Sequence, residues 1–110
     1  MAMAREREGK EKSMTIKQRV RAGIRFLDKI YGRKAWKKKL KLDILDLADS
    51  FCCILGQTDS DFESHVKKLG LTDYGIYKLG FYVDSNIYKI HKQSTWDHLT
   101  AAWKEELRKI

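Results

Sequence analysis

The sequence predicts a mainly α-helical fold, a small single-domain bundle of four to five helices. Near residues 81–91 it also allows one short β-hairpin. Two observations lead to this fold class. Apolar residues recur at steps of three and four in several stretches of the 110-residue chain, which is the spacing of a helix face. Proline is absent, and glycine follows several of these stretches, as is common at helix C-termini.

The composition bounds the class of protein. Apolar residues make up 43% of the chain, enough for a globular core, and no apolar run approaches the roughly 20 residues that cross a bilayer. The charged start of the chain lacks the apolar segment of a secretory signal, and two adjacent cysteines do not form a disulfide framework. We therefore expect a cytoplasmic protein without a membrane partner, made of a disordered charged tail (1–13) and one helical domain (14–110).

The clearest helical pattern lies in residues 15–31. Gly32 is placed to end this helix, because glycine readily adopts the backbone conformation that follows a last helical turn. The next residues, 33–41, predict a short second helix with Trp36 and Leu40 on its apolar face. The apolar stripe of the first helix consists of Ile16, Val20, Ile24, Leu27 and Tyr31.

The central stretch LDILDLADSFCCILGQ, residues 42–57, is irregular. We expect its leucines to point inward and its aspartates to accept hydrogen bonds from backbone amides at turns or helix starts. Residues 50–56 predict a short buried helix, with Asp49 or Ser50 as its cap and Gly56 at its end.

A stronger start signal follows in residues 60–69. Ser60 and Glu63 have the spacing of a capping box, in which each side chain bonds a free amide at the helix start. Gly70 is placed to end the helix. The apolar stripe between these signals consists of Phe62, Val66 and Leu69.

The following residues predict one more short helix and then an extended segment. Thr72 is placed to cap a helix over 73–79, and Gly80 comes directly after it. Residues 81–91 contain two β-rich runs on either side of the turn-like sequence Asp-Ser-Asn. This pattern allows a small hairpin there.

The last predicted helix covers residues 95–109. Ser94 or Thr95 would cap it, since both side chains can accept a hydrogen bond from a free amide of the first turn. Its apolar residues have helical spacing and are expected to form a core stripe rather than a cofactor site. This stripe consists of Trp96, Leu99, Trp103 and Leu107.

Charge is distributed unevenly along a chain whose formal net charge is +8. Residues 14–41 hold eleven basic residues and one acidic residue, whereas residues 42–64 hold six acidic residues and no lysine or arginine. This asymmetry predicts a folded molecule with one face that attracts anions. A cluster of lysines and arginines that binds phosphates releases counterions, so its binding weakens as salt rises.

The basic segment is the strongest functional signal. Trp36 within it would suit base stacking, but its spacing to Leu40 favours a core position. No helix-turn-helix, zinc-finger or RRM pattern accompanies the segment, so the sequence gives no support for base-specific recognition. The candidate residues for binding an anion or nucleic acid are Lys17, Arg21, Arg25, Arg33, Lys34, Lys37, Lys38, Lys39 and Lys41.

Cysteine, aspartate and histidine offer weaker candidates. Adjacent Cys52 and Cys53 lack the C-x-x-C spacing of a zinc site, and Cys53 is expected in the core as a small apolar side chain. Asp43 and Asp46 would share a helix face and could serve as acid and base or hold Mg²⁺, although caps and ion pairs are the commoner use. The three histidines have no triad or chelate spacing. We therefore expect no cofactor, no metal site and no catalytic residue.

Three short motifs occur together within residues 16–110: Leu-Asp-x-Leu-Asp at 42–46, Cys-Ile-Leu-Gly-Gln at 53–57 and Leu-Thr-x-x-Trp at 99–103. As a set they resemble small accessory proteins of tailed phages and prophages. The resemblance implies a phage-type origin and a shared fold, with no assigned activity. Similar proteins often have Cys-x-x-Cys and then Tyr-Gly after the glutamine. Here Phe51-Cys52-Cys53 and Thr58-Asp59 stand instead, which weakens a shared metal or redox role.

Together these observations predict a small non-enzymatic accessory protein of phage type. It would bind an anionic partner, a nucleic acid or a nucleotide, through its basic N-terminal third, in the host cytoplasm. The alternative is a host-takeover or counter-defence protein that inhibits a host protein or sequesters a signal molecule. A small metal-dependent enzyme using Asp43 and Asp46 ranks third.

Overall fold

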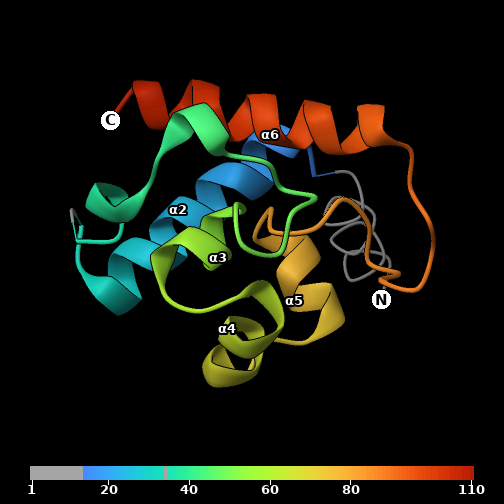
Figure 1. Cartoon of the computed structure of the whole chain (residues 1–110), viewed down its shortest axis with the longest axis horizontal. Coiled ribbons are helices and arrows are strands. Elements are labelled where there is room, and N and C mark those ends of the chain that lie inside the picture. The colour runs from blue at the N-terminus through green and yellow to red at the C-terminus, as the bar shows by residue number, and fades with distance from the viewer. Residues whose placement is uncertain (1–13, 34) are drawn as a thin grey trace, which may run out of the picture.

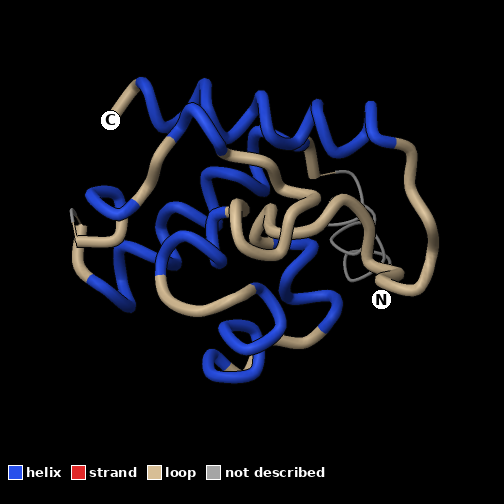
Figure 2. Tube along the Cα trace, viewed as in Figure 1, coloured by secondary structure: helices blue, strands red, loops and turns tan. Residues whose placement is uncertain are grey.

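Five α-helices and two 3₁₀ turns make up the regular structure in the computed structural model, which describes residues 14–33 and 35–110 (Figure 1). Within those residues there is no strand, so the predicted mainly helical fold is confirmed (Figure 2). The β-hairpin that the sequence allowed at 81–91 does not form. The tail predicted at 1–13 lies outside the described residues. The elements are α2 (Ile16–Tyr31), η1 (Lys37–Lys39), η2 (Leu42–Ile44), α3 (Ile54–Thr58), α4 (Phe62–Leu69), α5 (Asp73–Lys78) and α6 (Gln93–Arg108).

The first helix, α2, has the bounds that its apolar stripe predicts. A capping box fixes its start: the Thr15 hydroxyl accepts the Gln18 amide at 3.1 Å, and Gln18 Oε1 accepts the Thr15 amide at 2.9 Å. Gly32 ends it with φ of 89°, a value that suits glycine alone among common residues.

The two long helices, α2 and α6, pack against each other, and α5 packs on α2 (Figure 1). Gly23 permits this close approach. A Cβ atom at Gly23 would lie 2.1 Å from the Leu79 carbonyl oxygen and 2.9 Å from the Trp103 ring. The absence of a side chain at this position therefore sets how closely three elements can meet.

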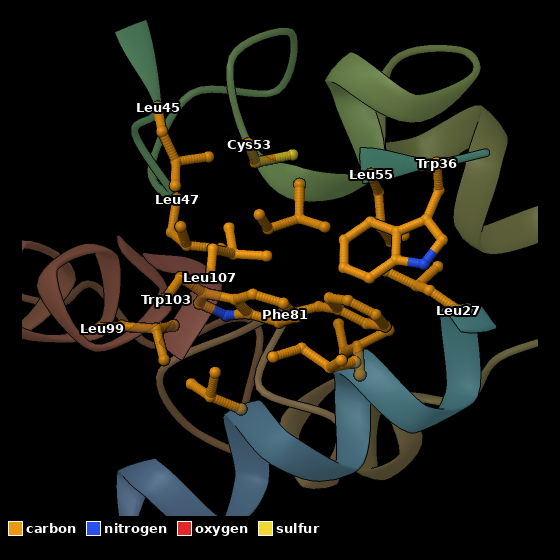
Figure 3. Packing of buried hydrophobic residues seen from close by; sticks show 14 residues of the cluster. Leu27, Trp36, Leu45, Leu47, Cys53, Leu55, Phe81, Leu99, Trp103 and Leu107 are labelled. Carbon is orange, nitrogen blue, oxygen red and sulfur yellow. The ribbon is translucent and has the colours of Figure 1, made fainter. Parts of the chain in front are cut away.

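The buried apolar core contains side chains from α2, α3, α5 and α6 and from the segments between helices (Figure 3). Phe81 and Trp103 stack with their ring centroids 5.7 Å apart, and the Trp103 Nε1–H donates to the Gly80 carbonyl at 2.6 Å. This bond satisfies the one polar atom of a fully buried indole, as a core tryptophan requires. Cys53 lies in the same core beside Ile54, which confirms the core position predicted for it.

The short helix predicted at 33–41 is wrong. Among the described residues of this range, only the single 3₁₀ turn η1 forms, and the backbone at Leu40 is already extended, with ψ of 133°. The physical reason is anchoring: Trp36 is 1% exposed and is held in the core, which fixes the chain direction at that point. The remaining residues of the segment are mostly lysines, which supply no second buried face for a helix.

The central stretch uses its aspartates as predicted. Asp46 Oδ1 accepts the Ala48 amide at 3.0 Å, and Asp49 Oδ1 accepts the Phe51 amide at 2.8 Å. The short helix after them differs from the prediction, because α3 begins at Ile54 with Cys53 as its N-cap and continues past Gly56 to Thr58. Gly56 does not end the helix. Its role is close contact, since a Cβ atom there would lie 2.3 Å from the Ser50 carbonyl oxygen.

In the second half of the chain, one predicted helix end and one predicted helix start are confirmed. Gly70 ends α4 in the left-handed conformation, and the Thr72 hydroxyl caps α5 by accepting the Gly75 amide at 3.0 Å. The predicted capping box of Ser60 is wrong, because Asp61 is the N-cap of α4 and accepts the Ser64 amide. A carboxylate competes well for this position, since it is a stronger acceptor than a hydroxyl.

The segment between α5 and α6 forms turns and does not pair as the two strands of a hairpin. Asp84 accepts the Asn86 amide at 3.1 Å and Asn86 accepts the Tyr88 amide at 3.0 Å, so short side chains bond these amides in place of a neighbouring strand.

The last helix, α6, starts at Gln93, two residues before the predicted start, without a side-chain cap from Ser94 or Thr95. None of the helices in the described part of the chain has the length and apolar content to cross a bilayer.

Candidate anion-binding groove

Three segments far apart in the sequence meet at a surface groove of about 620 Å³. One wall is the second half of α2, another is the turn at η1, and the third is the end of α6, whose terminus lies beside η1 (Figure 1). The lining residues are Ile24, Asp28, Arg33, Lys37, Lys38, Lys109 and Ile110. Four cations and one acidic side chain thus line the groove together with two isoleucine side chains.

The carboxylate of Asp28 organises the η1 side of the groove. Asp28 Oδ1 accepts the Trp36 Nε1–H at 2.7 Å, and Lys37 Nζ lies 3.6 Å from the same oxygen. Lys37 Nζ also lies 5.5 Å from the centroid of the Trp36 ring, within cation–π range. Because Trp36 is fixed in the core, this arrangement holds the basic turn against α2.

Two of the groove cations remain available. Within residues 14–33 and 35–110, neither Arg33 nor Lys38 forms a salt bridge, and both side chains are exposed. An arginine fork can bind two oxygens of one phosphate, and a lysine adds a point charge. These two residues therefore are the most direct candidates for contact with an anion.

The fourth cation, Lys109, is held by Glu106. Lys109 Nζ donates to Glu106 Oε2 at 3.0 Å, and Arg21 Nε donates to Glu106 Oε1 at 2.7 Å. Hydrogen bonds from Arg21 and Lys109 lower the pKa of Glu106, and the bond to Glu106 raises the pKa of Lys109. Lys109 Nζ also lies 3.6 Å from Glu105 Oε1. Two cations and two carboxylates therefore meet at the end of α6, and this network fixes the position of Lys109 beside the groove.

The structure brings three of the nine predicted binding residues to the groove: Arg33, Lys37 and Lys38. Among the others, Arg21 is engaged by Glu106, and Lys39 Nζ donates to the Thr58 carbonyl at 3.2 Å beside a separate small pocket. Lys34 lies outside the described residues. The remaining three, Lys17, Arg25 and Lys41, are exposed but do not line the groove.

Sequence reasoning missed Lys109 and Asp28 as groove residues. Lys109 is distant in sequence from the basic segment, and only the packing of α6 on α2 brings the two together. A signal for Asp28 was present, since it is the one acidic residue among the eleven basic residues of 14–41.

A smaller apolar hollow of about 180 Å³ adjoins the groove. Lys37 and Ile110 line both, so the two spaces share a wall. The residues that line only the smaller hollow are Leu40, Leu42 and Leu107. The site therefore has a cationic part and an apolar part side by side.

The surroundings of the two cysteines indicate a structural role and not a reactive one. Burial raises the pKa of Cys53 to about 11, so its thiol is protonated at neutral pH. Cys53 Sγ accepts the Gly56 amide at 3.2 Å and so caps α3. Partial burial and the nearby Asp49 also raise the pKa of Cys52. Neither thiol has the lowered pKa of a reactive cysteine.

Asp43 and Asp46 line a different surface hollow, of about 430 Å³, together with Asp97 and Lys104. Asp46 already accepts a backbone amide, so one of its oxygens is engaged in a turn. Among the described residues, no group of three histidine, cysteine, aspartate or glutamate side chains has an arrangement that could hold a metal ion.

The buried histidine, His65, is part of the core. Its Nδ1 lies 2.9 Å from the Leu55 carbonyl oxygen, which can only accept, so Nδ1 carries the proton. Its Nε2 then accepts from the Tyr31 hydroxyl at 2.5 Å. Burial raises the pKa of Tyr31, which keeps this donor protonated. Both ring nitrogens are satisfied, so His65 links α2, α3 and α4.

Comparisons of the chain with known protein families, with curated proteins and with solved structures found no match. The support for a function therefore comes from the geometry of the groove and from the charge pattern of the sequence.

Proposed function

We propose that this chain is a small non-enzymatic binding protein that holds a phosphate-bearing partner, a nucleic acid or a nucleotide, in the groove between α2, η1 and the end of α6. The observation that supports the proposal is that three cations of the basic segment and Lys109 from the end of α6 line one groove together with Asp28. Two of these cations, Arg33 and Lys38, have no ion-pair partner among the described residues.

Like charges brought together by folding repel one another, and an anion in the groove offsets this repulsion. At a separation of several ångströms, each such pair interacts by a few tenths of a kcal/mol to about 1 kcal/mol at a wet surface, and more in a hollow with apolar walls. The Ile24 and Ile110 side chains supply such walls. Electrostatics of this kind favours a multiply charged group such as phosphate over a single carboxylate.

The test is fluorescence anisotropy with labelled single- and double-stranded DNA, RNA and a labelled nucleotide, at low and then physiological salt. The variant Arg33→Ala/Lys38→Ala removes two groove cations. The matched control, Lys89→Ala/Lys92→Ala, removes two exposed lysines of the segment before α6. Since α6 has 16 residues and so is about 24 Å long, this segment lies far from the groove at its other end (Figure 1).

We expect binding that weakens as salt rises, that falls at least about tenfold in the groove variant, and that changes little in the control. The groove variant is also expected to lower the slope of log K against log salt by about two. Equal losses in both variants would mean that only net charge matters, and the groove would be rejected as the site.

A second candidate function, binding to a host protein, is favoured by a different surface. Tyr88 and Ile90 are 87% and 96% exposed in the segment between α5 and α6. Two large apolar side chains exposed so close together are typical of an interaction surface. The resemblance to phage accessory proteins adds that a host protein or a host signal molecule is a reasonable partner. Native mass spectrometry after expression in a bacterial host tests this: a one-to-one complex that is lost in Tyr88→Ser/Ile90→Ser would support it.

A further inference from the structure

We propose that the ligand of the groove is a single phosphorylated small molecule of mononucleotide size, whose hydroxyl or amino groups donate hydrogen bonds to Asp28, and not a nucleic-acid polymer. This inference rests on the proposed function and names the ligand class for the same site.

The size of the site agrees with a small ligand. The cationic part has a volume of about 620 Å³ and the adjoining apolar part about 180 Å³. Small-molecule sites in proteins enclose roughly 300–1,000 Å³, with mostly apolar walls and a few placed polar groups. The cations would take the phosphate, and the hollow beside Leu40, Leu42 and Leu107 would take an apolar ring face.

Among the described residues, two cations of the basic segment are engaged by protein groups, which makes them less free to form a track for a polymer. A polymer needs a row of cations along its backbone and exposed aromatic rings for its bases. Here Arg21 is bound by Glu106, and the Lys39 ammonium is bound by the Thr58 carbonyl. Trp36, the aromatic residue of the basic segment, is buried with its Nε1 bonded to Asp28, so it has no free face for a base.

Asp28 gives the strongest indication of ligand class. It is the one acidic side chain among the described groove residues, and its repulsion weakens the binding of a bare phosphate or of a simple row of phosphates. A carboxylate becomes favourable when the ligand itself brings donors. Aspartate and glutamate bind ribose hydroxyls in dinucleotide sites and accept from amino groups of bases. A site with a built-in acceptor rejects analogues that lack the matching donor.

The experiment is isothermal titration of the full chain near physiological salt with nucleoside monophosphates and triphosphates, inorganic phosphate and a short single-stranded oligonucleotide. We expect one-to-one binding of at least one nucleotide, about tenfold or more tighter than inorganic phosphate. The Asp28→Asn variant is expected to bind inorganic phosphate more tightly and the nucleotide less tightly, because the negative charge is lost and one of the two acceptor oxygens is replaced by an NH2 group, which can only donate. Asparagine Oδ1 still accepts from Trp36, so the fold is retained, and the thermal midpoint checks this.

The outcomes separate this inference from the proposed function. If the oligonucleotide binds more tightly than any nucleotide, and Arg33→Ala/Lys38→Ala abolishes that binding, the groove stands but the ligand is a polymer. If Asp28→Asn strengthens binding of phosphate and nucleotide equally, the role of Asp28 is rejected. If no phosphate compound binds, or the groove variant changes nothing, the proposed function itself fails. The comparison of nucleotide with inorganic phosphate on the unmodified chain needs no variant at all.

Discussion

The Trp36 Nε1–H donates a 2.7 Å hydrogen bond to the carboxylate of Asp28. This bond joins the basic turn to α2, and it links the core to the groove, since Trp36 is buried and Asp28 faces the cations. The same Asp28 oxygen lies 3.6 Å from Lys37 Nζ. The indole–carboxylate contact therefore helps to fix the position of the groove cations on the η1 side.

Replacing Trp36 with phenylalanine removes this donor and leaves a small cavity. We expect the free energy of unfolding to fall by about 2–4 kcal/mol, from a hydrogen bond to a charged group plus lost packing. Urea unfolding followed by circular dichroism measures this. Asp28→Asn keeps an acceptor and is expected to cost less.

The double variant Trp36→Phe/Asp28→Ala provides the control for the predicted role of the indole–carboxylate hydrogen bond. Because the two residues act through one contact, the effects of Trp36→Phe and Asp28→Ala should not add, and the double variant should be less destabilised than the sum by about 0.5–3 kcal/mol. Strict additivity would show that the hydrogen bond contributes nothing measurable to stability.

Gly23 gives a second prediction. A methyl group there would meet the Leu79 carbonyl oxygen at 2.1 Å and the Trp103 ring at 2.9 Å, so Gly23→Ala must force α2 away from its neighbours. We expect a loss of at least about 2 kcal/mol in spite of the better helix propensity of alanine.

Gly75→Ala is the matched comparison for Gly23→Ala. The nearest atom to a Cβ at Gly75 is the Thr72 hydroxyl at 3.2 Å, which can move slightly, and alanine favours the helix. The expected change is within about 1 kcal/mol of zero. Equal thermal midpoints for the two variants would contradict the close approach of α2 to Leu79 and Trp103.

Periodicity predicted the long helices because their apolar stripes are long enough to determine the local structure. The stripe of α2 and that of α6 each recur over four turns, and glycine marked the ends of α2 and α4. Short segments were predicted less well. At 33–41 the burial of Trp36 outweighed the weak helical pattern, and at 60–61 an aspartate took the cap position from the predicted serine.

Three of the four groove cations could be predicted from the sequence and the fourth could not. Arg33, Lys37 and Lys38 belong to one charged segment, so composition alone indicates them. Lys109 reaches the groove through long-range packing of α6 on α2, which leaves no local pattern in the sequence. Lys39 shows the converse: it belongs to the same charged run, but its ammonium group is bound to the Thr58 carbonyl.

Glu106 gives a prediction for pH. It is 4% exposed, and hydrogen bonds from Arg21 and Lys109 lower its pKa below the ordinary value of 4.5. A carboxyl group with a lowered pKa in the folded state contributes stability above its unfolded pKa, and that contribution is lost as pH falls through the folded value. The unfolding free energy should therefore fall below about pH 4.5.

Glu106→Gln isolates this contribution. Other carboxyl groups, including Asp61 and Asp84, also have lowered pKa values, so the unmodified chain loses stability in acid for several reasons. The variant should be less stable than the unmodified chain at neutral pH, and the difference should shrink as pH falls below about 4.5. Urea titrations at several pH values measure it. A constant difference at all pH values would show that Glu106 acts through packing and not through its charge.

The two adjacent cysteines should differ sharply in reactivity. Cys53 is buried with its pKa raised to about 11, so at about pH 8 its thiolate fraction is roughly two orders of magnitude below that of a free thiol, and the core also blocks the reagent. In Cys52→Ala, labelling of Cys53 with a disulfide reagent should follow the unfolding rate and become complete in denaturant. In Cys53→Ala, half-buried Cys52 should react in the folded state, more slowly than a free thiol because its pKa is also raised. Rapid labelling of Cys53 in the folded Cys52→Ala variant would contradict its place in the core and would reopen a chemical role for this pair.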